Sequence, residues 1–126
     1  MSFLKNFRGA QKEDIPMDWK VLNQESQLDQ IITDSYQKPT VLFKHSTRCG
    51  ISIGAKHRLE SKWNFTSEDL DFYYLDLLNF RSISNAIAER LGIIHQSPQV
   101  IALKDGKVIY HTSHHQINVE GLRSSI

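Results

Sequence analysis

The sequence predicts an α/β domain in which a four-stranded mixed sheet is flanked by helices. Short runs of β-branched and aromatic residues alternate with segments of helical periodicity, and strands joined through helices pair in parallel by right-handed crossovers. Late in the chain, two apolar runs instead flank Asp105-Gly106. An Asp-Gly turn between such runs indicates an antiparallel hairpin, so both kinds of strand pairing are expected in one sheet.

The first half of the predicted domain alternates strand and helix. Residues 19–22 form a short apolar run typical of a strand, and residues 26–36 place Leu28, Ile31, Ile32 and Tyr36 at helical spacing. Pro39 bars continuation of this helix, and the β-rich residues 40–44 follow. After Cys49 the apolar residues recur every four positions, which predicts that one face of a helix packs on the sheet; they are Ile51, Ala55, Leu59 and Trp63.

The second half repeats the alternation and then closes with the hairpin. Residues 71–76 are rich in aromatics and predict a strand, and a helix is expected to begin at Ser82 as its N-cap and to stop at Gly92. The hairpin strands are residues 99–103 and 107–110, and a final short helix is expected from about Asn118. The resulting order, β-α-β-α-β-α-β-β-α, fits the thioredoxin-like plan.

Length and composition limit the classes of function. The 126 residues fit one domain, expected over residues 18–126, with residues 1–17 as a loosely held arm because they lack periodicity. Fifteen Lys and Arg against fourteen Asp and Glu give a net charge of +1 without a basic run, which argues against nucleic acid and membrane partners. No secretory signal or membrane span is recognisable, so a soluble cytoplasmic protein is expected.

Cys49 is the only cysteine, so it cannot form an internal disulfide. It lies between a predicted strand and a predicted helix, where the open helix N-terminus and the adjacent Arg48 favour thiolate over thiol. The alternative is that the sulfur is inert core packing, which is common for cysteine. The neighbours Arg48, Gly50 and Ser52 would make a poor core environment, so a reactive sulfur is the better interpretation.

Ser52 occupies the place where a dithiol protein would have its second cysteine. Its hydroxyl can donate to the sulfur anion of Cys49, but it cannot form a disulfide. The stable product of attack by Cys49 is then a mixed disulfide with an outside molecule, and a second external thiol must clear it. The pattern therefore predicts a one-cysteine mechanism.

Four segments together resemble a known family. They are Thr47-Arg48-Cys49-Gly50-Ile51-Ser52, then Gly92-Ile93-Ile94-His95-Gln96-Ser97-Pro98-Gln99, then Asp105-Gly106-Lys107-Val108, and finally His111-Thr112-Ser113-His114. The chain resembles the monothiol bacilliredoxins, the YtxJ-like branch of the thioredoxin superfamily, from about residue 19 to the C-terminus. The resemblance implies an oxidoreductase that removes bacillithiol from S-thiolated cytoplasmic client proteins, with bacillithiol as co-substrate and no other cofactor.

The resemblance also implies roles for individual residues. Cys49 is the nucleophile, Ser52 holds the resolving position without resolving, and Pro98 is the cis-proline that faces the sulfur. The backbone of Ser97 pairs with the incoming substrate in a strand-like way. The other residues expected to bind substrate flank the cysteine and are Arg48, Gly50 and Ile51. Gly50 departs from the family, which commonly has proline there and thereby a preorganised first helical turn.

Two other functions remain open at this stage. Gly50 brings the motif close to the Cys-Gly-Phe-Ser of monothiol glutaredoxins, which carry [2Fe–2S] clusters with glutathione. Against this, residues 110–114 lack the paired glycines and the acidic residue by which glutaredoxins hold glutathione. A redox-inactive thioredoxin-fold binding module is the third possibility, although the retained cysteine and Ser-Pro junction argue against it.

The histidines invite a metal hypothesis, because His111, His114 and His115 are close in sequence. Their stretch leaves a strand and enters a turn, and it contains no cysteine or acidic partner, so no metal site is expected. Structural or solvent-exposed roles are the better interpretation, with His114 the candidate to approach the active face.

Overall fold

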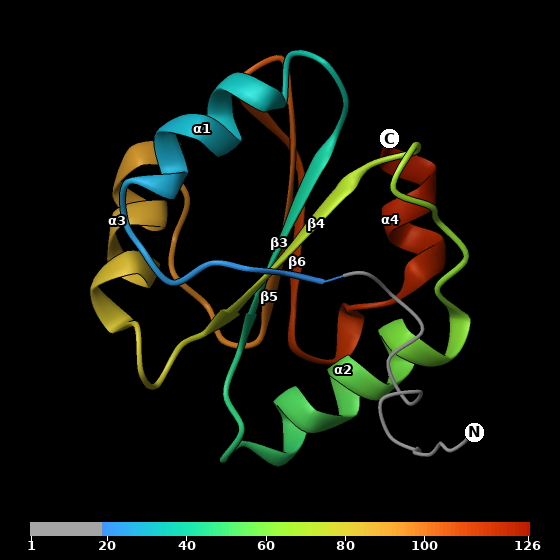
Figure 1. Ribbon diagram of the computed structural model, residues 1–126. Helices are drawn as coiled ribbons and strands as arrows, with labels where there is room; N and C mark the ends of the chain where they lie inside the picture. The colour runs from blue at the N-terminus through green and yellow to red at the C-terminus, as the bar shows by residue number, and fades with distance from the viewer. Residues whose placement is uncertain (1–18) are drawn as a thin grey trace, which may run out of the picture.

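The computed structural model describes residues 19–126, so the expected loose arm over residues 1–17 lies outside the described part. The elements follow the predicted order (Figure 1). They are β2 (Lys20–Val21), α1 (Gln27–Asp34), β3 (Thr40–His45), α2 (Gly50–Lys62), β4 (Asp71–Asp76), α3 (Arg81–Leu91), β5 (Gln99–Lys104), β6 (Lys107–Ser113), the 3-10 helix η3 (His114–Gln116) and α4 (Val119–Ser125).

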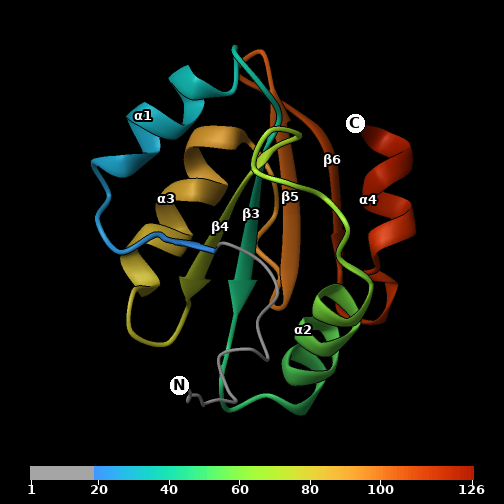
Figure 2. The ribbon, with the colours of Figure 1, turned by 45° about the vertical axis from the view of Figure 1, so that its right-hand side comes forward.

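The strands form one mixed sheet in the order β2-β4-β3-β5-β6. Strand β4 pairs in parallel with both β2 and β3, whereas β5 is antiparallel to both β3 and β6. Helices α1 and α3 cover one face of the sheet, and α2 and α4 cover the other (Figures 1 and 2). The predicted α/β class and the mixed pairing are therefore confirmed.

The prediction of a four-stranded sheet is wrong by one strand. Residues 20–21 pair with β4 through Lys20↔Tyr73 and Val21↔Tyr74, and the Leu22 N–H donates to the Tyr74 carbonyl at 2.9 Å. A run this short adds few ladder hydrogen bonds, so side-chain contacts must contribute to its attachment. The side chain of Leu22 is fully buried, which supplies one such contact.

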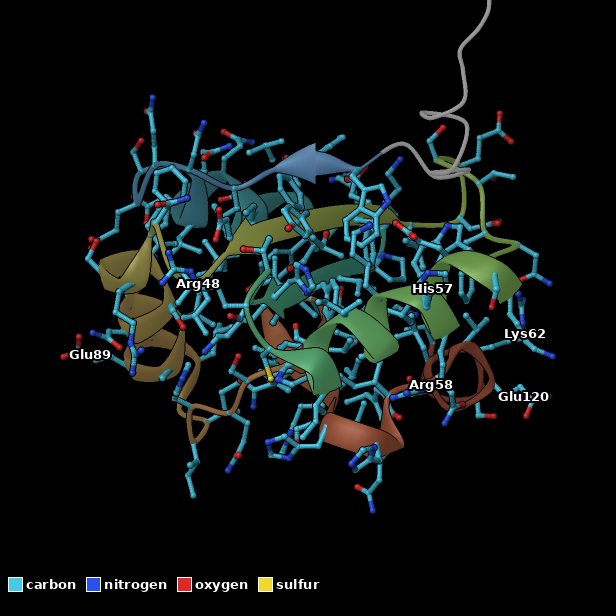
Figure 3. The ribbon with its side chains drawn as sticks, turned by 90° about the horizontal axis from the view of Figure 1, so that it is seen from below. Arg48, His57, Arg58, Lys62, Glu89 and Glu120 are labelled. Carbon is cyan, nitrogen blue, oxygen red and sulfur yellow. The ribbon has the colours of Figure 1, made fainter. Side chains whose placement is uncertain are left out.

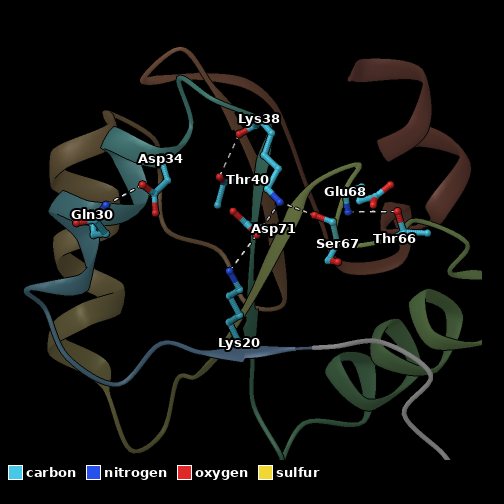
Figure 4. Close-up of polar contacts among 9 residues, drawn as sticks. All are labelled: Lys20, Gln30, Asp34, Lys38, Thr40, Thr66, Ser67, Glu68 and Asp71. Atoms are coloured by element: carbon cyan, nitrogen blue, oxygen red, sulfur yellow. Dashed lines mark hydrogen bonds and ion pairs between the residues drawn. The ribbon is translucent and has the colours of Figure 1, made fainter.

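A buried carboxylate ties the edge strand to the rest of the sheet (Figure 4). Asp71 lies at the start of β4, and its Oδ1 accepts from Lys20 Nζ at 3.0 Å and lies 3.5 Å from Lys38 Nζ. Lys38 also donates to the Ser67 carbonyl. The Trp19 ring packs edge-on against Phe72 with centroids 4.3 Å apart. These contacts explain why β2 joins the sheet despite its length.

The two faces of β3 bury different side chains because successive residues of a strand point to opposite sides. Val41 and Phe43 belong to the core layer under α2 and α4, and Leu42 belongs to the layer under α1 and α3. The first layer also holds Ala55, Leu59, Leu70, Phe72, Val100, Ala102, Ile117, Val119 and Leu122. The second holds Leu22, Leu28, Ile31, Leu75, Ile83, Ala86, Ile87, Ile101 and Leu103.

The predicted hairpin and the last helix are confirmed. Asp105 and Gly106 both have positive φ, 53° and 76°, as a tight primed turn requires. A Cβ on Gly106 would lie 2.5 Å from the Tyr36 hydroxyl, so a larger residue there would have to displace the Tyr36 ring as well as adopt a positive φ. Asn118 caps α4, its Oδ1 accepting from the Gly121 N–H at 2.7 Å.

Two helix predictions need correction. In α2 the buried residues are Ser52, Ala55 and Leu59, while Ile51 is 41% exposed. A four-residue spacing rotates by about 40° per step, so Ile51 drifts off the face that Leu59 occupies. Helix α3 begins at Arg81 with Phe80 as its N-cap, so the serine expected to cap it lies inside the first turn. No helix of residues 19–126 is long and apolar enough to cross a membrane.

Candidate active site

Cys49 is the N-cap residue of α2 and lies just beyond the end of β3. Its backbone is extended, with φ −112° and ψ 120°, its N–H donates to the Ser46 carbonyl at 3.3 Å, and its carbonyl accepts from Ile53 at 2.9 Å. The residue is half-buried. Figure 3 looks onto the end of the sheet at which α2 begins. The sulfur is thus carried on a fixed backbone, by a residue that is only half-buried.

The residues beside Cys49 leave the start of α2 open. Arg48, Gly50 and Ile51 are exposed, the first turn of the helix contains no acidic residue, and no side chain caps it. Unpaired N–H groups and the positive end of the helix dipole therefore lie next to the cysteine. The open start of a helix is a general site for anions.

Ser52 is fully buried, and its hydroxyl has two partners. Oγ accepts from the Ser46 N–H at 3.0 Å and lies 2.6 Å from His45 Nδ1. Burial, with a smaller contribution from Lys56, lowers the pKa of His45 to about 4, so its ring is neutral near pH 7. With its proton on Nε2, the neutral ring can accept the hydroxyl proton at Nδ1, which would satisfy both buried groups.

Within residues 19–126 the hydrogen-bond partners of the Ser52 hydroxyl are His45 and the Ser46 N–H, and none joins it to the sulfur of Cys49. Donation from Ser52 to the thiolate stays a prediction. Ser52 fixes the loop between β3 and α2. From the sequence His45 is only a basic residue shortly upstream of Cys49; its contact with Ser52 was missed, although the alternation along β3 places it on the face that α2 covers, with Val41 and Phe43.

Ser97 and Pro98 lie at the same end of the sheet as Cys49, because the register of β3 with β5 pairs Lys44 with Gln99. The Ser97–Pro98 peptide bond is cis. The buried Pro98 offers its carbonyl to the His114 N–H at 3.1 Å. The structure thus brings together the two segments that sequence analysis singled out.

Arg58 joins these segments from α2. Its Nε donates to the Ile117 carbonyl at 2.9 Å and its Nη2 to the His114 carbonyl at 3.0 Å, so α2 is bound to the turn that also contacts Pro98 (Figure 3). His114 thus approaches the site through its backbone. His111 and His115 are exposed, and within residues 19–126 no group of three or more His, Cys, Asp or Glu is placed to hold a metal ion.

The fold and the site define a thioredoxin-fold protein with a thiol redox function. The family model of the monothiol bacilliredoxin BrxC matches residues 20–122, and the chain belongs to this family. The predicted family is confirmed by this match, as is the extent of the resemblance along the chain.

Solved structures agree. One described as a thioredoxin-fold protein with a proposed oxidoreductase function is 30% identical, with a TM-score of 0.71, over 83% of this chain and 90% of that one. The thioredoxin of Malassezia sympodialis is 19% identical with a TM-score of 0.65, over 87% of this chain and 89% of its own. The thioredoxin of Fasciola hepatica is 20% identical with a TM-score of 0.62, over 85% and 95%. The thioredoxins share the fold with this chain.

Proposed function

We propose that the protein removes a low-molecular-weight thiol, bacillithiol, from mixed disulfides on cytoplasmic client proteins by a one-cysteine mechanism. The observation that carries this proposal is the half-buried Cys49 at the open start of α2, with a buried serine at position 52 where a resolving cysteine would stand. Membership of the monothiol bacilliredoxin family supports the choice of thiol.

The reaction has two balanced steps. The thiolate of Cys49 attacks the bacillithiol sulfur of the mixed disulfide, a new disulfide forms between Cys49 and bacillithiol, and the client leaves as a thiolate that takes up a proton. A second thiol from solution then attacks the bacillithiol sulfur. It forms a disulfide with bacillithiol and releases Cys49 as a thiolate, so no other oxidant or reductant is needed.

Ser52 makes the external second step obligatory. An oxygen cannot take part in thiol-disulfide exchange, and this hydroxyl is held in the core by His45 and Ser46. The adduct on Cys49 therefore persists until another thiol arrives. A stable adduct is the expected resting state wherever the second thiol is scarce.

The surroundings of Cys49 suit a protein-sized substrate. We expect the backbone of Ser97, next to the cis bond to Pro98, to pair with an extended segment of the client. Arg48, Gly50 and Ile51 are exposed, lie next to Cys49 in the chain and would contact the client or the thiol. Main-chain hydrogen bonds depend little on the amino-acid sequence of the client, which fits an enzyme with many clients.

The test is the release of bacillithiol from a purified S-thiolated protein, followed by intact-mass spectrometry of both proteins. The wild type should free the client thiol and gain the mass of bacillithiol, and Cys49→Ser should do neither. Ser61→Ala, a change at an exposed serine of α2, serves as the matched control.

Three outcomes would overturn the proposal. Undiminished release of bacillithiol by Cys49→Ser would show that Cys49 is not the nucleophile. A wild type without activity would favour a redox-inactive binding module. Stable uptake of an iron–sulfur cluster by the wild type after anaerobic reconstitution, without release of bacillithiol, would favour the glutaredoxin-like alternative.

A further inference from the structure

Lys44 is a charged residue buried at the active end of β3. Its side chain has no exposed surface, and its Nζ donates to the Ser84 carbonyl of α3 at 3.2 Å and lies 3.1 Å from His95 Nδ1. No carboxylate of residues 19–126 forms an ion pair with it. A buried ammonium without a counter-charge is unfavourable for folding, so its retention calls for another explanation.

The ammonium fixes the orientation of the His95 ring. Lys44 Nζ carries only donors, so His95 Nδ1 must accept from it. The Ser84 hydroxyl lies 3.2 Å from the same nitrogen and can donate to it as well. Nδ1 is thus an acceptor, and the single proton of the neutral ring is placed on Nε2.

The ring of His95 stays neutral near pH 7. Burial, and then the charges of Lys44 and Arg81, lower the pKa of His95 below its ordinary value. Its Nε2 makes no hydrogen bond within residues 19–126, and it is not among the buried unpaired polar atoms of that part of the chain. His95 therefore presents a fixed N–H donor to solvent.

The loop that carries His95 is held firmly beside the site. The buried Gln99 donates from Nε2 to the Ile94 carbonyl at 3.0 Å, and its Oε1 accepts from the Gln96 N–H at 3.4 Å. The same loop continues into Ser97 and Pro98. The end of this loop at Ser97 and Pro98 and the start of α2 at Cys49 both lie at the lower end of the sheet in Figure 1, so the loop borders the end of the sheet that carries the sulfur.

The charges around His95 favour an anionic partner. Lys44 and Arg81 act on the ring, and neither forms an ion pair with a carboxylate of the described residues. Asp76, at the same end of the sheet, shares a face of β4 with Phe72 and so lies on the α2 side, where its Oδ2 accepts from Asn79. The side of the site near α3 therefore has uncompensated positive charge.

We propose that His95 is a substrate-binding residue whose Nε2–H donates to a carboxylate oxygen of the low-molecular-weight thiol, and that Lys44 is the positioning residue that fixes its tautomer. This inference rests on the proposed function and names the chemical class of thiol that the site prefers. A carboxylate accepts such a bond strongly because the acceptor is charged.

The first test compares two small thiols that differ only in charge. One test peptide carries 3-mercaptopropionate as a mixed disulfide, and the other carries 3-mercaptopropionamide. The wild type should release the carboxylate thiol with a kcat/KM about tenfold higher, equivalent to about 1.4 kcal/mol. His95→Leu should abolish this preference and His95→Gln, which keeps a side-chain N–H, should restore part of it. The exposed His115→Leu is the matched control.

The outcomes separate this inference from the proposed function. If the wild type releases both thiols equally, or if His95→Leu keeps the preference, the assignment of His95 is overturned while the exchange activity stands. If the wild type releases neither thiol and also fails on the bacillithiol client, the proposed function itself fails.

The second test reads the tautomer without activity. Nitrogen-15 NMR of the histidine rings at pH 7.5 should show His95 protonated on Nε2 in the wild type and as a mixture of tautomers in Lys44→Met. Addition of 3-mercaptopropionate to Cys49→Ser, which keeps the site but cannot react, should shift the Nε2 signal. A ring protonated on Nδ1, or an Nε2 signal that the carboxylate leaves unmoved, would contradict the proposal.

Discussion

Lys44 and His45 are adjacent in sequence, yet they serve opposite faces of the sheet. His45 points toward α2 and holds Ser52, in the helix that begins at the cysteine, whereas Lys44 points toward α3 and holds His95, in the loop that leads to Pro98. Each buries a titratable group at the end of β3. The comparison shows that one strand end fixes both halves of the site through two consecutive side chains.

The two groups differ in charge and therefore in what they do to stability. The ring of His45 is neutral near pH 7 and completes the hydrogen bonds of a buried hydroxyl, so it stabilises the fold. Lys44 is still largely protonated at pH 7 and has only neutral partners, so its burial is unfavourable. The difference indicates that His45, on the α2 side, contributes to stability, whereas Lys44, on the α3 side, contributes a positive charge at the cost of stability.

The largest effect expected from this difference is loss of stability in acid. The pKa of His45 is about 4 in the folded protein and 6.5 ordinarily. Between pH 6.5 and pH 4 this ring is therefore protonated in the unfolded chain but neutral in the folded protein. Stability then falls as pH falls, by up to about 3 kcal/mol. Urea unfolding at pH 7 and pH 4.5 measures it. His45→Phe should show a smaller fall than the control His111→Gln, and equal falls in the two variants would contradict the prediction.

Alkaline pH should have the opposite effect through Lys44. Burial, with a smaller contribution from Arg81, lowers the pKa of Lys44 to about 8, so above that pH the folded protein loses a proton that the unfolded chain still holds. Stability rises from about pH 8 by roughly 2 kcal/mol, until ionisation of Tyr74 in the unfolded chain opposes it near pH 10. The pKa of Tyr74 is raised by burial to about 12.

Lys44→Met isolates this alkaline effect. Urea unfolding at pH 7.5 and pH 9.5 should show a rise in stability for the wild type and for the exposed control Lys107→Met, but none for Lys44→Met. At pH 7.5 Lys44→Met should be as stable as the wild type or more so, because the buried charge is gone. A strongly destabilised Lys44→Met would show that Lys44 is a structural residue.

A slightly smaller effect is expected from Ser52→Ala. The change leaves the Ser46 N–H and His45 Nδ1 buried without their partner, which destabilises the fold by about 1–3 kcal/mol. Chemical denaturation measures the loss, with the exposed Ser61→Ala as control. Cys49 should still react with a small alkylating reagent in Ser52→Ala, since the hydroxyl makes no hydrogen bond to the sulfur within residues 19–126. A large drop in that rate would restore a direct role for Ser52 at the sulfur.

The smallest effect on stability is expected at Gly50, which takes part in neither the His45–Ser52 contact nor the Lys44–His95 contact. A Cβ there would meet no atom within 4 Å, and the extended backbone of Cys49 suits a following proline. Gly50→Pro should therefore stabilise the protein by about 0.4–1 kcal/mol by restricting the unfolded chain. Thermal unfolding compares it with Gly50→Ala. Lower stability in Gly50→Pro would mean that the first turn of α2 needs the freedom of glycine.

Much of the fold could be predicted because its signals are local. The Asp105-Gly106 turn, the cap at Asn118 and the stop at Gly92 each depend on the conformation of a few neighbouring residues. The short run at residues 19–22 predicts a strand, but its place in the sheet could not be predicted with equal ease. The strand pairs with β4, and Lys20 bonds Asp71, which lies fifty-one positions away in the chain.

The family resemblance and the reactive cysteine could both be recognised from motif spacing alone, because Cys49 needs only the end of a strand and the start of a helix beside it. The helix face was misjudged at Ile51 for a geometric reason, the drift of a four-residue repeat. The buried partners of Ser52, His45 and the Ser46 N–H, could not be predicted for another reason. The hydrogen-bond partner of a buried hydroxyl depends on the side chains that the packing of the sheet and helices places next to it.

The sequence by itself determined the order of the elements, the lone sulfur at a helix start and the absence of a second cysteine. Only the tertiary structure decided that His45 holds Ser52 and that Lys44 holds His95, because these contacts join segments that alternation along one strand sends to opposite faces. Local patterns depend on neighbours in the chain, whereas the partners of a buried polar group depend on how distant elements pack.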